Sequence, residues 1–159
     1  LHQYKVKGES ADVLVAAMAS DSPYRDPQGS SWPGGTEYQL SWRWVPTRGA
    51  QCRVAPVKVT VSMVLPKVVT AAPLRDGVQA YLDALVVHER GHVDIVQAAV
   101  AELEQTLSAI PVGDCDAVGA SVDQAGQRAL AAMSKAHVRY DKTTGHGRTQ
   151  RARLRPHLP

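Results

Sequence analysis

Apolar and polar residues alternate along two segments in the first half of the chain, and this pattern predicts two strands. Residues 37–44 place large apolar side chains at every second position, and residues 51–65 do so with one change of phase at Pro56. A period of two places alternate side chains on one face of a strand, and a phase shift at a proline is typical of a bulge or an edge. A turn at residues 46–49 separates the segments, so we expect an antiparallel hairpin. Residues 3–7 alternate more weakly and predict a short strand.

The apolar period becomes helical after Pro66. A long helix is predicted over residues 74–109, where Pro111 ends it. A second helix is predicted over about residues 115–138. The remainder, from residue 140 onward, is rich in Gly, Thr and Arg and is predicted to be loop and tail.

Local signals mark where the helices begin. Ser10 and Asp114 are suited to N-cap positions, and Pro73 is suited to a first helical turn. Ser10 precedes a short predicted helix over residues 11–18, and the prolines and glycines of residues 21–35 predict a long loop. The expected fold class is therefore α+β, with a small antiparallel sheet packed against the long helix and a second, C-terminal helix, as in a minimal zincin-like domain.

Composition and charge fit one small globular domain with a basic end. The 159 residues are 44% hydrophobic and 21% charged, and no apolar run is long enough to cross a bilayer. We expect one domain over residues 1–147 and a basic tail over residues 148–159, solvated or disordered, which holds four arginines and no acidic residue. No interleaving of basic and aromatic residues indicates a nucleic-acid partner. The chain begins at Leu1, which we interpret as a chain whose targeting segment is absent.

The two cysteines, Cys52 and Cys115, are far apart and do not form a metal-binding pair. In an exported protein we expect them to form one disulfide. Such a bond stabilises the fold by roughly 4 kcal/mol in the loop-entropy account. In a reducing compartment they would instead be two buried thiols.

The long helix carries a His-Glu-x-x-His motif on its apolar face, with His88, Glu89 and His92 as its chemical groups. A carboxylate buried between two histidines is costly unless a cation compensates it. Histidines at i and i+4 can bind one zinc ion, with the glutamate as general base for a zinc-bound water. Gly91, inside the motif, leaves room for another chain segment or a substrate. A solvated, ion-paired helix patch is the alternative, and the apolar placement argues against it.

A catalytic zinc site of this kind needs a third protein ligand and an open position. The downstream candidates are His137, Asp141 and His146. His137 falls on the apolar face of the second helix and equally fits a packed core histidine, whereas His146 stands between two glycines. The residues alone leave Asp141 and His146 as alternatives.

Residues 140–147 read Tyr-Asp-Lys-Thr-Thr-Gly-His-Gly, well downstream of the first motif. Together with the opening residues 4–8, the Trp42-x-Trp44 strand and the two cysteines, the paired motifs resemble an uncharacterised bacterial family. That family is described as predicted secreted zinc-dependent proteases (domain-of-unknown-function family 922). The resemblance covers nearly the whole chain up to about Gly147.

The resemblance implies that the two motif histidines bind zinc, that Glu89 is the general base, and that His146 is the third ligand. Asp141 is the alternative, because deuterolysin-like zinc peptidases use an aspartate from a downstream segment that also contains tyrosine. If it is not a ligand, Asp141 can orient a zinc-bound histidine. Tyr140 is then a candidate to hydrogen-bond the developing oxyanion, or an aromatic residue that packs at the helix end.

Site and resemblance together predict a secreted or periplasmic zinc metallopeptidase that acts as a monomer on a peptide or protein substrate. Two other functions stay open. One is a zinc amide hydrolase that acts on cell-wall peptides, and the other is a non-catalytic secreted module with a structural metal. Glu89 argues against the second, because a structural site has no use for an adjacent base.

Overall fold

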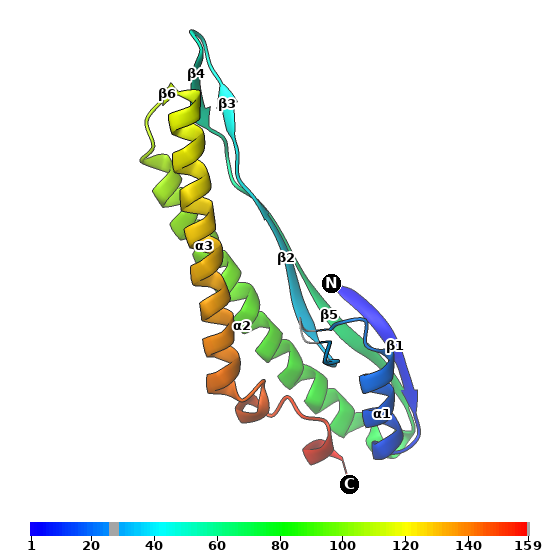
Figure 1. The fold of residues 1–159 in the computed structure, drawn as a ribbon. Helices are drawn as coiled ribbons and strands as arrows, with labels where there is room; N and C mark the ends of the chain where they lie inside the picture. Colours follow the sequence, from blue (N-terminus) through cyan, green and yellow to red (C-terminus); the bar gives the residue numbers. More distant parts are fainter. Residues whose placement is uncertain (26–28, 159) are drawn as a thin grey trace. The chain divides into compact units, whose positions relative to one another are not determined.

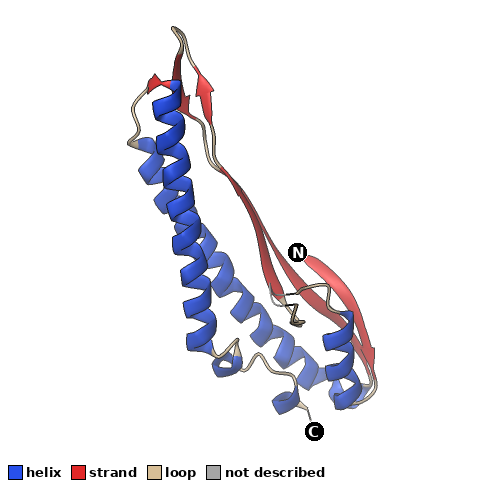
Figure 2. Cartoon of the chain, viewed as in Figure 1, coloured by secondary structure: helices blue, strands red, loops and turns tan. Residues whose placement is uncertain are grey.

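The structure, a computed structural model, describes residues 1–25 and 29–158. Over these ranges it has a mixed α+β fold (Figures 1 and 2), which confirms the predicted class. The described strands form two three-stranded sheets, with the orders β1-β5-β2 and β3-β4-β6. The helices are α1 (Ala11–Asp21), α2 (Arg75–Ser108) and α3 (Cys115–Thr144), with short 3-10 helices η1 (Ala72–Leu74), η2 (Arg148–Gln150) and η3 (Arg155–His157). The strands are β1 (His2–Gly8), β2 (Gly35–Ser41), β3 (Trp44–Pro46), β4 (Gln51–Val54), β5 (Lys58–Thr70) and β6 (Gly113–Asp114).

The described residues divide into two compact units, each with its own hydrophobic core. We call them the site unit and the disulfide unit. The site unit comprises Leu1–Glu37, Ser62–His92 and Tyr140–Pro159, and the disulfide unit comprises Tyr38–Val61 and Val93–Arg139. The predicted division into a functional domain at residues 1–147 and a tail stays a prediction.

In the site unit, β1 lies parallel to β5, with His2 opposite Val64 and Gly8 opposite Thr70. The strand predicted at residues 3–7 is thereby confirmed. The long helix predicted over residues 74–109 is confirmed as α2, but the expected change of period directly after Pro66 is wrong, because β5 continues through this proline to Thr70. The parallel partner explains the extension, since β1 pairs with this part of β5 from a distant part of the sequence. A local period cannot reveal such a partner.

The C-terminal residues belong to the core of the site unit. Ala152 and Leu154 are each 6% exposed and pack in the same cluster as Leu14 of α1 and Tyr81 of α2. The prediction of a solvated or disordered tail is therefore wrong for these residues. Two apolar residues among four arginines do not establish an apolar period, so the sequence pattern did not predict that they are buried. The other buried members of this cluster are Val6, Met18, Leu65, Leu74, Val78 and Leu85.

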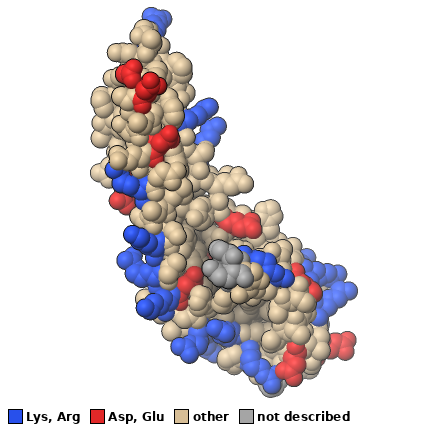
Figure 3. All heavy atoms as spheres, viewed as in Figure 1, with Lys and Arg blue, Asp and Glu red and all other residues tan. Residues whose placement is uncertain are grey.

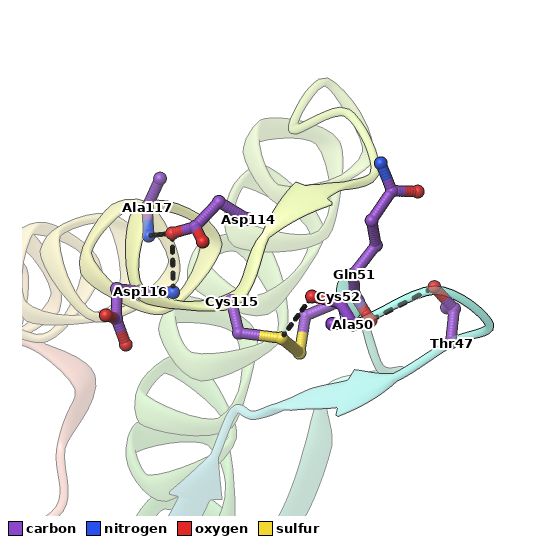
Figure 4. The surroundings of a disulfide bond; sticks show 8 residues. All are labelled: Thr47, Ala50, Gln51, Cys52, Asp114, Cys115, Asp116 and Ala117. Atoms are coloured by element: carbon purple, nitrogen blue, oxygen red, sulfur yellow. Dashed lines mark hydrogen bonds between the residues drawn. A yellow bond between two sulfur atoms is a disulfide. The ribbon is translucent and has the colours of Figure 1, made fainter.

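In the disulfide unit, the predicted antiparallel hairpin and disulfide are both present. Trp44 of β3 lies opposite Val54 of β4, and β6 adds a third strand beside β4. Cys52 of β4 and Cys115 of α3 form a disulfide, which confirms that prediction (Figure 4). This bond ties the hairpin to the start of α3, and Figure 4 shows Asp114 beside it.

The predicted helix starts are confirmed by capping contacts. The Ser10 hydroxyl accepts a hydrogen bond from the Val13 backbone N–H at 3.4 Å. Oδ1 of Asp114 accepts from the backbone N–H groups of Asp116 and Ala117 at 3.0 and 3.1 Å (Figure 4). Such caps satisfy donors that have no partner inside the helix. Pro73 lies in η1, directly before α2.

The prediction that α3 ends near residue 138 is wrong, because the helix continues to Thr144. The Thr144 hydroxyl donates to the Tyr140 carbonyl at 2.8 Å, so a polar side chain supports the last turn. Gly145 then adopts a φ of 57°, and a left-handed residue at this place commonly ends a helix. The first part of the segment predicted as a loop is therefore helical as far as Thr144, and this part includes Asp141.

Of the loop predicted at residues 21–35, Asp21 ends α1 and Gly35 begins β2, and the described residues between them form only an isolated bridge, between Arg25 and Ser31. Residues 26–28 of this prediction lie outside the described residues. In the described ranges, every helix is too short or too polar to cross a bilayer. Acidic and basic side chains are interspersed on the face shown in Figure 3, in keeping with a net charge of +3.

Candidate metal centre

Two helices of the site unit bring three ligand atoms together. His88 and His92 lie one turn apart on α2, and Asp141 lies in the last turn of α3. Oδ1 of Asp141 is 3.5 Å from Nε2 of His88 and 3.1 Å from Nε2 of His92. Among the described residues, these three offer ligand atoms that all lie within 4.8 Å of one another. Two imidazole nitrogens and a carboxylate oxygen at this spacing can hold one metal ion.

Gly91 accounts for the close approach of α3 to the motif. A Cβ at this position would overlap the Tyr140 hydroxyl, so a larger residue would push the tyrosine away. Tyr140 stacks on the His88 ring, with centroids 5.2 Å apart, and meets the His92 ring edge-on at 4.9 Å. The prediction that Gly91 admits another chain segment is confirmed.

The side chain of His88 is buried and held from both ends. Nδ1 of its ring lies 2.9 Å from Oε1 of Gln150, and Nε2 faces Asp141. Gly147 packs against the ring, since a Cβ there would lie 3.2 Å from Cγ of His88. The ring therefore has one nitrogen bound within the protein and the other directed at the carboxylate.

Glu89 is the most deeply buried carboxylate of the motif region. It is 4% exposed, and the Thr36 hydroxyl lies 2.9 Å from its Oε2 and 3.1 Å from its backbone carbonyl oxygen. Because a hydroxyl has one proton, Thr36 donates to one of these oxygens at a time. Burial raises the pKa of the Glu89 carboxyl group, and the Thr36 hydrogen bond acts in the opposite direction. The protonated form of Glu89 is therefore favoured more than in an exposed glutamate.

The charges of the three candidate ligand residues compensate one another. Burial alone would raise the pKa of Asp141, but the hydrogen bonds of His88 and His92 and the charges of His92 and His146 outweigh it and hold that pKa well below its usual range. Burial alone would lower the pKa of His88, but its hydrogen bonds to Asp141 and Gln150 outweigh this effect and raise that pKa. Both directions follow from the favourable contacts between the histidine rings and the carboxylate.

His146 lies at the edge of this group but is not a member of it. Its Nδ1 is 3.9 Å from Oδ1 of Asp141, its side chain is 49% exposed, and its ring stacks on Trp32 at 4.7 Å. Its backbone has a φ of 51°, between Gly145 at 57° and Gly147 at 79°. The geometry therefore favours Asp141 over His146 as the third ligand, and the assignment itself stays a prediction.

The remaining candidates are engaged elsewhere. His137 belongs to the disulfide unit and stacks on Tyr38 at 5.7 Å, which supports the interpretation of a packed histidine. The Tyr140 hydroxyl donates to the His88 carbonyl oxygen at 3.1 Å and accepts from Nε2 of Gln150 at 3.0 Å. To donate to an oxyanion, the hydroxyl would have to give up its bond to the His88 carbonyl oxygen, and this predicted role stays a prediction.

Sequence reasoning missed three residues of the site. Thr36 binds Glu89 from β2, Gln150 binds His88 from η2, and Trp32 stacks on His146 from a loop. Thr36 and Gln150 are polar residues in segments with no motif of their own, so nothing local distinguished them. Trp32 is a large apolar residue in a predicted loop, and such a residue in a polar segment can indicate a packing contact.

Comparison with known proteins places the chain in one family. Residues 1–147 match the family described as bacterial protein of unknown function (DUF922), so the chain belongs to that family. No curated protein and no solved structure matches the chain.

Proposed function

We propose that this member of the family is a secreted zinc metallopeptidase. The observation that carries the proposal is the burial of Glu89 beside the converging nitrogens and oxygen of His88, His92 and Asp141. A buried carboxylate next to a set of metal ligands has a use in acid–base catalysis, which a closed structural metal site does not need. The disulfide fits a protein that works in an oxidising compartment.

The donor set suits zinc. Two histidine nitrogens and a carboxylate oxygen are a three-residue ligand set typical of catalytic zinc, and they leave a fourth position for the reacting molecules. When bound there, zinc polarises a carbonyl group and makes water a better nucleophile at neutral pH. We assign His88, His92 and Asp141 as the residues that hold it, in place of His146.

Thr36 and Glu89 then have separate roles in the proposed reaction. Thr36 holds Oε2 of Glu89 at 2.9 Å and so fixes the direction of the carboxylate. Glu89 accepts a proton from the attacking water and returns it to the leaving amine, for which its raised pKa is suited. Burial of the carboxylate and of His88 keeps competing water away from these groups.

The test compares zinc content and peptide cleavage in three proteins. Wild type is expected to bind one zinc ion per chain and to cleave members of a peptide library. Glu89→Gln is expected to keep the zinc and to cleave about 10²- to 10⁴-fold more slowly, because it lacks the proton acceptor. Glu102→Gln, an exposed position on the same helix, is the matched control and should behave as wild type.

Three outcomes would contradict the proposal in different parts. Wild type that binds zinc but cleaves nothing would reject the enzyme and leave a metal-binding module. Full activity of Glu89→Gln would reject the assigned base. Cleavage confined to cell-wall peptide fragments would replace the peptidase with an amide hydrolase of narrower substrate class.

A further inference from the structure

Three hydrogen bonds form a closed ring that begins and ends on His88. Oε1 of Gln150 lies 2.9 Å from Nδ1 of His88, and Nε2 of Gln150 donates to the Tyr140 hydroxyl at 3.0 Å. The Tyr140 hydroxyl in turn donates to the backbone carbonyl oxygen of His88 at 3.1 Å. His88, Tyr140 and Gln150 are all at least partly buried. Water reaches their polar atoms poorly, so these hydrogen bonds take the place of bonds to water.

The direction of the donors around this ring determines the tautomer of His88. A carbonyl oxygen can only accept, so the hydroxyl of Tyr140 must donate to it. The hydroxyl oxygen then accepts from the amide nitrogen of Gln150, which turns the amide oxygen toward His88. An amide oxygen can only accept, so Nδ1 of His88 carries a proton. In the neutral ring, Nε2 therefore presents a lone pair toward Asp141, the arrangement that a metal ligand needs.

The segment that carries Gln150 is fixed to the site unit at several points. Ala152 and Leu154 are buried in its core, and the backbone carbonyl of His157 lies so close to Gly77 of α2 that a Cβ there would overlap it. Arg155 forms an ion pair with Asp12 of α1 at 3.4 Å. Gln150 is thus held by the surrounding fold and does not depend on its contact with His88.

We propose that Gln150 is a positioning residue that keeps Nδ1 of His88 protonated and Nε2 free to bind the metal. Gln150 lies beyond residues 1–147, the part of the chain that matches the family, so residues 148–158 complete the metal site. The inference rests on the metal-binding part of the proposed function and does not depend on any peptidase activity.

The test uses the whole chain and measures two properties besides catalysis. Zn²⁺ affinity is measured by competition with a chelator, and the His88 ring is observed by nitrogen-15 NMR in the zinc-loaded protein. Gln150→Met keeps the length of the side chain and removes both hydrogen-bonding atoms. Gln150→Glu restores the acceptor for Nδ1, and Gln127→Met, at an exposed position of α3, is the matched control.

Wild type is expected to show an Nδ1–H proton on His88 that exchanges slowly with solvent. Gln150→Met is expected to bind Zn²⁺ about 10- to 100-fold more weakly and to lose this slow exchange. Gln150→Glu should recover most of the affinity, and Gln127→Met should equal wild type. A merely structural role would lower the thermal stability of Gln150→Met without changing the tautomer.

Two results would overturn the proposal. One is a Gln150→Met protein whose Zn²⁺ affinity lies within twofold of wild type. The other is a zinc-loaded wild type in which His88 carries its proton on Nε2. If Gln150→Met fails to fold, the wild-type spectrum and Gln150→Glu still decide the matter. Failure of the proposed function looks different, since a wild type that binds zinc through Nε2 of His88 and cleaves no peptide rejects only the peptidase.

Discussion

Gly91→Ala is expected to destabilise the site unit, although alanine is the better helix former. In an open helix the change stabilises by about 1 kcal/mol. Here the added Cβ would overlap the Tyr140 hydroxyl, which has hydrogen bonds on both sides and a ring stacked on His88. Forcing an extra methyl group into such packing costs about 1–3 kcal/mol. After the helical gain is subtracted, we expect a net loss of up to about 2 kcal/mol.

A double-mutant cycle isolates this contact. In a Tyr140→Ala background the obstacle is gone, so Gly91→Ala should stabilise by about 1 kcal/mol, and the sign of its effect should reverse. The free energy of unfolding is measured by urea titration for wild type, both single variants and the double variant. Gly119→Ala is a comparison on α3, where a Cβ would meet the Trp44 ring at 2.8 Å and that ring is 37% exposed and can give way. A raised stability of Gly91→Ala alone, or an equal effect of Gly91→Ala in the wild-type and Tyr140→Ala backgrounds, would refute the reasoning.

Two further predictions concern the third ligand and a buried tyrosine. Asp141→Ala should weaken Zn²⁺ binding by at least about tenfold, since even the loss of a ligand's hydrogen-bond partner has an effect of this size. His146→Ala should leave the affinity nearly unchanged. Both affinities are measured by chelator competition, and a larger loss for His146→Ala than for Asp141→Ala would identify His146 as the third ligand. Tyr81 has a 1% exposed side chain, and its hydroxyl has no hydrogen-bond partner among the described residues, so Tyr81→Phe should stabilise by about 1 kcal/mol at pH 7 in urea titrations. Burial raises the pKa of the Tyr81 hydroxyl above its value in the unfolded chain. Above about pH 10 the hydroxyl therefore ionises in the unfolded chain but stays neutral in the folded protein, which lowers the free energy of unfolding as the pH rises. Wild type should therefore lose stability above pH 10 more steeply than Tyr81→Phe, and equal slopes would contradict this.

The sequence was sufficient where the information is local. The caps at Ser10 and Asp114 depend on atoms two or three residues away, so their residue types predicted them correctly. The phase of Glu89 on α2 likewise predicted its burial, because one helical period relates it to its apolar neighbours.

The sequence was insufficient where a distant partner decides the outcome. The strand through Pro66 continues because β1 pairs with it, and α3 continues past residue 138 because its end packs against the motif at Gly91. The choice between Asp141 and His146 as third ligand also stayed open because it depends on a distant part of the chain. Placing Asp141 on a helix directs it at both histidines, and residue spacing alone did not predict that this helix reaches so far.

The separation of the metal-binding residues along the chain has a consequence for the order in which the site is made. His92 and Asp141 are 49 residues apart, and His88 and Gln150 are 62 apart. During synthesis the His-Glu-x-x-His helix therefore emerges well before the carboxylate and the amide that complete its surroundings. The nascent chain holds only two of the three proposed ligands for the whole of that interval, and two ligands hold a metal ion less tightly than three. The proposed metal site is thus complete only after the last turn of α3 has been translated and Asp141 has reached the two histidines.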